Sequence, residues 1–367
     1  MFRAFNFGSG PAALPQSVLE KAQRELLNWN QRGMSILEIG HRTPDFMQKV
    51  AEKSESDLRS LLNVPDNYHI LFLAGGGQTQ FGMVPLNLLA RNKNLVADYI
   101  NSGIWSEKAI QEAKRYGNIH IAADCTANQF TCIPQEDAWQ LTPDAAYLHY
   151  TDNETIGGLR FPFIPTSQIP LVADMTSSLL SEPLDVSRFG IIYAGAQKNI
   201  SAAGLTIVII RDDLIGQALP FTPTLWNYQT HRDAHSLFNT PPVFSWYLAS
   251  LVFEWLKEQG GLGEMQKRNQ EKAQLLYKTI DTSEGFYKNP IHPSCRSLMN
   301  IPFTLPTTNL EQQFLSEAQQ QHLMNLKGHK LVGGIRASIY NAVSLDAVKT
   351  LVTFMQSFAK QHHKDHL

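Results

Sequence analysis

The stretch GIIYAGAQKNI, residues 190–200, predicts a buried strand and raises the question of what lies at its end. Its first half is apolar and β-branched, which is typical of a strand covered on both faces. It ends at Lys198, which is flanked by small and amide residues and has no acidic neighbour in sequence. Such a lysine either extends to water or is desolvated, and desolvation lowers the lysine pKa toward that of a neutral amine nucleophile.

Further apolar runs lie on both sides of this stretch and alternate with helix-like segments between about residues 43 and 210. They are residues 68–77, 94–105, 145–150, 169–175 and 204–211. Near-continuous apolar strands separated by helices indicate an α/β fold with a mostly parallel central sheet covered by helices. We expect this large domain to span residues 16–260.

The pattern changes after about residue 280. Strand-like runs occur at 297–305 and 331–340, and a helix is predicted at 311–324. Ser344 is a predicted N-cap of a final helix, in which Leu345, Val348, Leu351 and Val352 recur at helical spacing. We expect residues 261–367 to form a smaller α+β domain, joined by the N-terminal segment 1–15.

Composition excludes several classes of protein. The net charge of -2 argues against nucleic-acid or membrane-surface binding, and no run of about 18 apolar residues predicts a membrane span. The N-terminus has no apolar signal region, so we expect a cytoplasmic protein. Cys125, Cys132 and Cys295 are too few for a disulfide framework, and without a CxxC pair no metal site is predicted.

Asp174 stands at the end of the 169–175 run and precedes Lys198 in the chain. An isolated aspartate in this position is more often an N-cap for the following turn. However, catalytic groups of α/β enzymes gather at the carboxyl ends of parallel strands. A buried carboxylate and a lysine at two such ends match a pyridoxal phosphate site, where the carboxylate keeps the pyridine nitrogen protonated and the lysine binds the aldehyde.

Three glycines, Gly75 to Gly77, separate a predicted strand from a predicted helix. They form either a simple tight turn or a phosphate cradle that uses backbone N–H groups at a helix N-terminus. The P-loop pattern is absent, and so is the GxGxxG fingerprint with its acidic residue. A nucleotide site or an NAD-dependent oxidoreductase is therefore the poorer interpretation.

Other polar and aromatic residues follow predicted strands. Trp105 closes the 94–105 run and either packs in the core or stacks on a flat cofactor ring. Thr155, in the sequence NET, offers a hydroxyl. Asn239 and Thr240 either cap the long helix predicted from Pro242 or reach a phosphate.

Taken together, these segments resemble the phosphoserine aminotransferase family, which are class V members of the fold-type I pyridoxal phosphate enzymes. The resemblance covers nearly the whole chain, and no single motif would suffice for it. The motifs are NFGSGPAALP (6–15), HRTPDF (41–46), LAGGGQTQF (73–81), ADYINSGIWSEKA (97–109), NETIGG (153–158), ADMTSSLLSEPLDVSRFGIIYAGAQKNI (173–200), FNTPP (238–242) and GHKLVGGIRASIYNA (328–342).

The resemblance implies roles around pyridoxal 5′-phosphate. Lys198 is expected to bind the cofactor covalently, Asp174 to contact its ring nitrogen, and Trp105 to stack on its ring. The remaining cofactor contacts are implied for Gly77, Gln78, Thr155, Ser177 and Gln197, and for Asn239 and Thr240 of the neighbouring subunit. The family forms homodimers with shared active sites, so we expect the same here.

The resemblance also implies how substrates are bound. Arg336 is expected to hold the α-carboxylate with its guanidinium fork; without the motif it reads as a surface arginine on an edge strand. His41 and Arg42 of the partner subunit, with His329 and Lys330, are expected at the substrate phosphate. Gln78 and Lys330 depart from the family pattern, since some members carry Arg at the first position and most carry Arg at the second.

The implied reaction is transamination between O-phospho-L-serine and 2-oxoglutarate, which gives 3-phosphohydroxypyruvate and L-glutamate in serine biosynthesis. A related reaction on 4-phosphohydroxy-L-threonine in vitamin B6 biosynthesis is also implied. A cysteine desulfurase or another aminotransferase is the rival of the same fold, but the three cysteines lie outside every motif. A binding or scaffold protein gives no reason for the combination of Lys198, Asp174 and Arg336.

Overall fold

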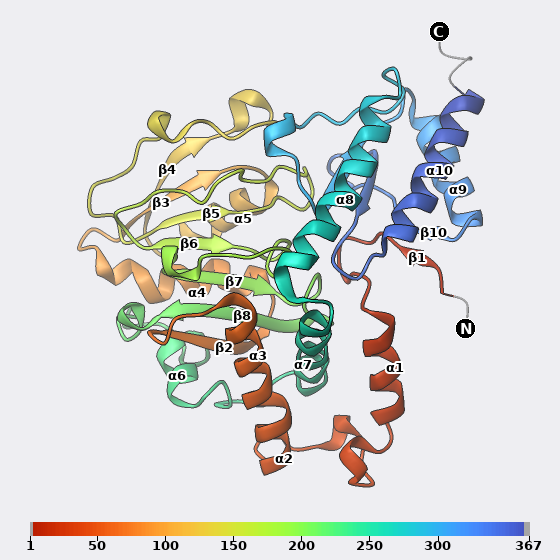
Figure 1. The fold of residues 1–367 in the computed structure, drawn as a ribbon. Coiled ribbons are helices and arrows are strands. Elements are labelled where there is room, and N and C mark those ends of the chain that lie inside the picture. Colours follow the sequence, from red (N-terminus) through yellow and green to blue (C-terminus); the bar gives the residue numbers. More distant parts are fainter. Residues whose placement is uncertain (1–2, 363–367) are drawn as a thin grey trace.

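The computed structural model describes residues 3–362, and its larger part is built on a seven-stranded sheet (Figure 1). The strand order across the sheet is β2-β8-β7-β6-β5-β3-β4. The strands are β2 Tyr68–Gly75, β3 Val96–Asn101, β4 Asn118–Asp124, β5 Leu148–Thr151, β6 Leu171–Asp174, β7 Ile191–Gly195 and β8 Gly204–Arg211. Strands β4, β3, β5, β6 and β7 pair in parallel, and β8 is antiparallel to both of its neighbours. The predicted mostly parallel sheet is confirmed.

Successive residues of the central strands point to opposite faces, and helices cover both faces. Ile192 and Ala194 of β7 pack in a core with α3 (Lys53–Leu62) and α7 (Val243–Glu258). Ile191 and Tyr193 pack on the other face with α4 (Gly77–Leu88) and α5 (Ile104–Ala113). Burial on both faces explains why these strands read as continuous apolar runs in the sequence.

The C-terminal part combines strands and helices, as predicted. It contains α8 Gly261–Asp281, β9 Asn300–Phe303, α9 Thr308–Gln320, β10 Leu323–Met324, β11 Ile335–Ser338 and α10 Leu345–His362. Strand β11 pairs antiparallel with β9, and β10 pairs in parallel with the N-terminal strand β1 (Phe5–Asn6). Phe7 lies in the core of this part, and the assignment of segment 1–15 to the smaller domain stays a prediction. The boundary between residues 260 and 261 stays a prediction.

Two element boundaries differ from the sequence prediction, and one strand was not predicted. The run 94–105 is not one strand, because β3 ends at Asn101 and Trp105 lies in the first turn of α5. The Ser106 hydroxyl accepts the N–H groups of Ser102 and Gly103 at 2.8 and 2.9 Å and so starts the helix there. The helix predicted at 311–324 ends at Gln320, since the following residues pair with β1. Edge strand β4 was not predicted, because five of its seven residues are only partly buried or exposed and its sequence mixes polar and apolar residues.

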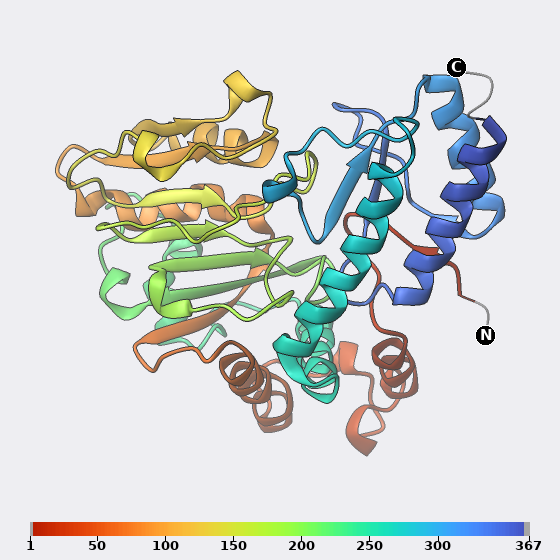
Figure 2. The same ribbon diagram turned by 45° about the horizontal axis from the view of Figure 1, so that its top comes forward.

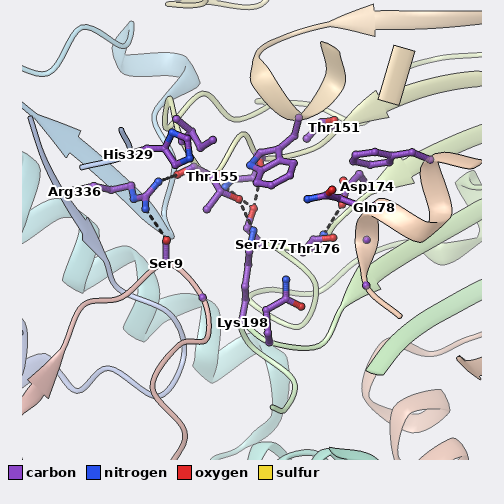
Figure 3. A pocket seen from close by; sticks show the side chains of 18 residues that line it. Ser9, Gln78, Thr151, Thr155, Asp174, Thr176, Ser177, Lys198, His329 and Arg336 are labelled. Carbon is purple, nitrogen blue, oxygen red and sulfur yellow. Dashed lines mark hydrogen bonds between the residues drawn. The ribbon is translucent and has the colours of Figure 1, made fainter. Parts of the chain in front are cut away.

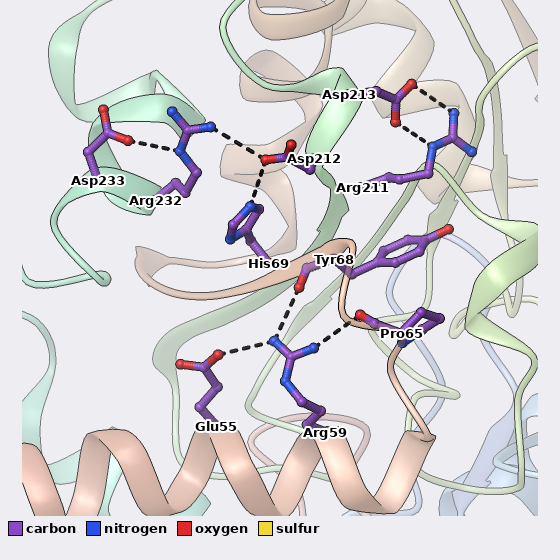
Figure 4. A network of polar contacts seen from close by, with 10 residues as sticks. All are labelled: Glu55, Arg59, Pro65, Tyr68, His69, Arg211, Asp212, Asp213, Arg232 and Asp233. Atoms are coloured by element: carbon purple, nitrogen blue, oxygen red, sulfur yellow. Dashed lines mark hydrogen bonds and ion pairs between the residues drawn. The ribbon is translucent and has the colours of Figure 1, made fainter.

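The remaining helices are α1 Gln16–Glu25, α2 Pro44–Phe46 and α6 Tyr228–Asp233. Charged side chains join α3, β2, β8 and α6 at the outer edge of the sheet (Figure 4). Arg59 donates to the carbonyls of Pro65 and Tyr68 at 3.1 Å each, and His69 contacts Asp212 at 2.8 Å. The exposed contact between His69 and Asp212 is screened by water, so it fixes this edge only weakly.

In Figure 2 the C-terminal part, drawn in blue, lies beside the edge of the sheet where the parallel strands end. Loops from both parts therefore meet at these strand ends. Among residues 3–362, no helix combines the length and apolar character needed to cross a membrane.

Candidate active site

A cavity of about 350 Å³ opens at the carboxyl ends of the parallel strands (Figure 3). Its walls come from the loops after β5, β6 and β7, from the starts of α4 and α5, and from the N- and C-terminal segments. The lining residues predicted from the sequence are Gly77, Gln78, Trp105, Thr155, Asp174, Ser177, Gln197, Lys198, His329 and Arg336. Ten of the predicted site residues, from six separate segments, thus meet in one cavity.

Lys198 extends into this cavity from the turn after β7. Only 7 % of the residue is exposed, and its amine donates a hydrogen bond to the Thr155 hydroxyl. Burial lowers the pKa of Lys198 to about 8, although the nearby Asp174 carboxylate opposes the shift. A substantial fraction of this amine is therefore neutral near pH 8 and able to act as a nucleophile or base.

Asp174 is the last residue of β6, and its carboxylate faces the same cavity. Its Oδ1 accepts the backbone N–H of Thr176 at 2.9 Å, and the Thr176 hydroxyl accepts the N–H of Gly195 at 3.2 Å. Burial raises the pKa of Asp174, while the Thr176 donors and the Lys198 charge oppose that shift. The loop after β6 is therefore tied to the strand that leads to Lys198.

Arg336 reaches the cavity from β11 and is 7 % exposed. One terminal nitrogen donates to the Ser9 hydroxyl at 2.6 Å, and the other donates to the Thr155 carbonyl at 3.3 Å. The Tyr340 hydroxyl also donates to the Ser9 carbonyl, at 3.0 Å. These contacts hold a buried guanidinium at the cavity wall, where a planar fork suits a carboxylate.

The glycine turn before α4 makes a narrow wall. A Cβ atom on Gly77 would lie 2.7 Å from the Thr176 hydroxyl, so only glycine fits there without a shift. Helix α4 begins at Gly77, and the first N–H groups of a helix have no partner within the helix. The turn therefore presents backbone donors to the cavity, which is the arrangement that binds phosphate.

Several polar atoms at the cavity are buried without a protein partner among the described residues. They are the Trp105 indole nitrogen, the Thr151 hydroxyl and the Asn153 side-chain oxygen. The amide nitrogen of Asn153 donates to the Ser177 hydroxyl at 2.8 Å. Buried polar groups are normally paired, so these orphaned atoms indicate a site built for a bound polar molecule.

The cavity has a basic end near His329. Burial lowers the pKa of His329, and the positive charges of Arg336, Lys108 and Lys330 lower it further. Lys330 itself is exposed and does not line the cavity. Lys108 was not predicted as a site residue; its ammonium lies 4.5 Å from the centre of the Trp105 ring.

Besides Lys330, four predicted site residues do not line this cavity: His41, Arg42, Asn239 and Thr240. Arg42 donates hydrogen bonds to the carbonyls of Leu237 and Phe238, each at 3.0 Å. The two predicted pairs are therefore neighbours in the fold although about 200 residues separate them in sequence.

Some lining residues were not predicted from the sequence. They are Ser9, Gly10, Phe81, Thr151, Asn153, Ile156 and Thr176, whereas Gly76 belongs to the glycine turn already named as a candidate phosphate cradle. Asn153 and Thr176 each lie two residues from a predicted site residue, Thr155 and Asp174 respectively, which is the signal that the sequence offers. Ser9 has no such neighbour in sequence.

Comparisons with known proteins agree with this geometry. The aminotransferase class-V family model matches residues 4–351. A phosphoserine aminotransferase of Laribacter hongkongensis is 56 % identical over 98 % of this chain and 99 % of its own, and one of Acinetobacter baumannii is 57 % identical over the same shares.

Solved structures are also similar over nearly the whole chain. The phosphoserine aminotransferase from Bacillus circulans subsp. alkalophilus superimposes with a TM-score of 0.95 at 43 % identity, covering 98 % of this chain and 99 % of its own. The pyridoxal phosphate-bound enzyme from Trichomonas vaginalis gives 0.92 at 40 % identity, covering 96 % and 100 %. A further structure, from a study of the Schiff base in a phosphoserine aminotransferase, superimposes with a TM-score of 0.94 at 46 % identity. It covers 98 % of this chain and 100 % of its own. The chain therefore belongs to the class V aminotransferases, and within them to the phosphoserine aminotransferase family.

Proposed function

We propose that this protein transfers the amino group of O-phospho-L-serine to 2-oxoglutarate, which gives 3-phosphohydroxypyruvate and L-glutamate. The observation that carries the proposal is the meeting of three groups in one buried cavity. A lysine amine, a carboxylate and a guanidinium reach it on Lys198, Asp174 and Arg336 from three separate elements. Family membership and the phosphoserine aminotransferase relatives support the same reaction.

The cavity fits pyridoxal 5′-phosphate. The glycine turn that a Cβ would fill and the orphaned buried polar atoms are the structural observations in favour. When bound, this cofactor supplies an electron sink for the pair released at the substrate Cα. We assign covalent attachment to Lys198, the ring nitrogen to Asp174, ring stacking to Trp105, and the phosphate and ring substituents to Gly77, Gln78, Thr155, Ser177 and Gln197.

The protein residues then divide the work of the reaction. The buried Asp174 carboxylate holds a proton on the ring nitrogen. The Lys198 amine would be released when the substrate amino group replaces it on the cofactor. Beside the Thr155 hydroxyl, the free amine then removes the proton from the substrate Cα and returns it in the later step. Because burial brings the pKa of Lys198 to about 8, the same nitrogen is suited to act as base and then as acid.

Substrate recognition is assigned to the two ends of the cavity. Arg336 binds the α-carboxylate, which both amino-acid and oxo-acid substrates carry. His329 lies at the basic end and contacts the substrate phosphate, with Lys330 adding positive charge nearby. The rival assignment as a cysteine desulfurase is disfavoured, because no cysteine is among the residues that line the cavity.

We also propose a homodimer in which each cavity is completed by the partner subunit. His41 and Arg42 would then reach the substrate phosphate of the other subunit, and Asn239 and Thr240 its cofactor phosphate. Their position beside one another and outside their own cavity supports this arrangement. We place the enzyme in the cytoplasm, in keeping with three free cysteines.

Mixed dimers test the sharing of sites. An inactive Lys198→Ala subunit and an inactive Arg42→Ala subunit should regain activity when unfolded and refolded together, because one of the two sites in the mixed dimer is then intact. No recovery would contradict shared sites.

A visible spectrum of the purified protein tests the reaction itself. We expect a yellow absorption band that is lost on adding phosphoserine and restored by 2-oxoglutarate. A band that responds only to another amino acid would overturn the substrate, and no band after adding pyridoxal phosphate would overturn the assignment of Lys198. The same assay with 4-phosphohydroxy-L-threonine tests the second reaction, in vitamin B6 biosynthesis.

A further inference from the structure

Glu154 is a buried carboxylate that lies directly behind the cavity wall. The residue is 1 % exposed and does not itself line the cavity. Its Oε2 accepts the backbone N–H of Trp105 at 3.0 Å, and its Oε1 accepts the backbone N–H of Ser106 at 2.8 Å. Both carboxylate oxygens are thus used at the start of α5, the helix that carries Trp105.

The surroundings of this carboxylate are built to admit it. A Cβ on Gly103 would lie 2.7 Å from the Glu154 carboxyl carbon, so the absence of a side chain there makes room for the group. The N–H groups at a helix start lack partners within the helix, and the helix dipole favours negative charge there. Burial nevertheless raises the pKa of Glu154 to about 7, so the fold retains a group that is costly to ionise.

The Trp105 ring depends on this backbone anchor. Within the part of the chain that the structure describes, its indole nitrogen is buried and has no hydrogen-bond partner. Its ring contacts the ammonium of Lys108, which is an exposed side chain of the same helix. Among the described residues no hydrogen bond of the ring therefore fixes its position, which depends on the placement of the first turn of α5.

Glu154 is itself held rigidly. Its N–H donates to the Leu159 carbonyl at 2.8 Å, and its carbonyl accepts the Gly158 N–H at 2.8 Å. Gly158 has a φ of +77°, and a Cβ there would lie 2.4 Å from the Pro302 ring. The turn that carries Glu154 is thus held by its own backbone hydrogen bonds and packs closely against β9.

We propose that Glu154 is a positioning residue, which sets the Trp105 ring against the plane of the cofactor through the two backbone N–H groups at the start of α5. The inference rests on the proposed function, because it assumes that Trp105 stacks on pyridoxal phosphate. It adds to that function a residue that acts through another and touches neither cofactor nor substrate.

The substitution Glu154→Gln tests the proposal with little change of shape. A carboxylate accepts two N–H groups, whereas an amide has one oxygen and an NH₂ that would face the second N–H donor. We expect the dissociation constant for pyridoxal phosphate to rise on the order of 10-fold, as loss of one hydrogen bond to a charged group implies. We also expect a weaker visible circular dichroism band of the bound cofactor.

A second readout uses the cofactor-free protein. Hydrogen exchange of residues 104–108 should quicken on the order of 10-fold in the variant, because the start of α5 opens locally when its acceptors are lost. If the wild-type protein does not bind pyridoxal phosphate, the proposed function fails. The exchange result still decides whether Glu154 holds Trp105.

Asp98→Asn is the matched control. Asp98 is a fully buried carboxylate of the same sheet that accepts the Thr142 N–H at 2.7 Å, but it lies away from the cavity. This variant should lose comparable stability and leave the cofactor affinity and the exchange of residues 104–108 unchanged. Gly103→Ala is a second test, because it keeps the Glu154 charge and displaces the carboxylate from α5; it should reproduce the Glu154→Gln changes.

The proposal is overturned if Glu154→Gln behaves like Asp98→Asn in both readouts. Should Glu154→Gln fail to fold, Gly103→Ala with wild-type affinity and wild-type exchange would overturn it as well.

Discussion

Replacing Arg336 by lysine should weaken both half-reactions by a similar factor. The guanidinium is buried and held in one plane by the Ser9 hydroxyl at 2.6 Å and the Thr155 carbonyl at 3.3 Å. A carboxylate bound to this fork receives two parallel N–H groups. A lysine at this position keeps the positive charge but offers one nitrogen, which cannot serve the carboxylate and both protein acceptors together.

The expected magnitude follows from one lost charge-assisted hydrogen bond. Such a bond contributes about 1.5–3 kcal/mol, which corresponds to a fall in kcat/KM of about 10- to 150-fold. In both phosphoserine and 2-oxoglutarate a carboxylate is bonded to the carbon that carries the reacting amino or oxo group. The fall should therefore be similar for the two substrates, whereas a residue at the phosphate end should affect them unequally.

The assay is stopped-flow absorbance of each half-reaction, with the resting spectrum as a check that cofactor binding is intact. Arg296→Lys is a matched control, because Arg296 forms a bidentate pair with Asp281 at 2.7 and 2.8 Å outside the cavity. The reasoning is refuted if Arg336→Lys leaves kcat/KM unchanged for both substrates, or lowers it for only one of them.

Three further predictions follow from other parts of the site and its support. The rate at which pyridoxal phosphate binds to the cofactor-free protein, measured by absorbance, should rise with pH around a midpoint near 8. Raising the pH through the pKa of Lys198 produces the neutral amine that reacts. A midpoint near 10 would contradict this prediction. Gly77→Ala should weaken cofactor binding at least about fivefold, since its Cβ would lie 2.7 Å from the Thr176 hydroxyl, and fluorescence titration that finds wild-type affinity would contradict it. Lys272→Met should lower the free energy of unfolding by about 1–3 kcal/mol. The Lys272 amine donates to three backbone carbonyls at 2.8–3.0 Å, and the variant loses these hydrogen bonds. A urea titration that shows equal or greater stability would mean that removing a buried charge outweighs those bonds.

The centre of the sheet and its two main site residues could be predicted from the sequence for a common reason. Strands buried on both faces are apolar along their length, so their ends are marked by the first polar residues. Asp174 is the last residue of β6, and Lys198 follows the end of β7 after Ala196 and Gln197. Because parallel neighbours finish at the same edge, two polar strand ends predict a shared site even though neither residue alone does.

The hydroxyl groups of Ser9 and Ser106 could not be predicted in this way. Ser9 contacts Arg336 across 327 residues of chain, and serine occurs too often for its position to be informative. Trp105 was expected at the end of a strand, but the Ser106 hydroxyl starts α5 before it. Hydrogen bonds of small polar side chains thus decided both details, and they leave no periodic pattern in the sequence.

The turn formed by Asn153, Glu154 and Thr155 explains how elements so far apart in sequence keep their geometry. Asn153 bonds the loop after β6, and Glu154 holds the start of α5. Thr155 contacts the Lys198 amine through its hydroxyl and the Arg336 guanidinium through its carbonyl. Adjacent residues of this one turn contact different elements. The Trp105 ring, the Lys198 amine and the Arg336 guanidinium are therefore all positioned relative to the same turn. The relative positions of these groups then depend on a few hydrogen bonds that this turn makes to its neighbours, and the 3.3 Å contact of Arg336 joins the turn to β11.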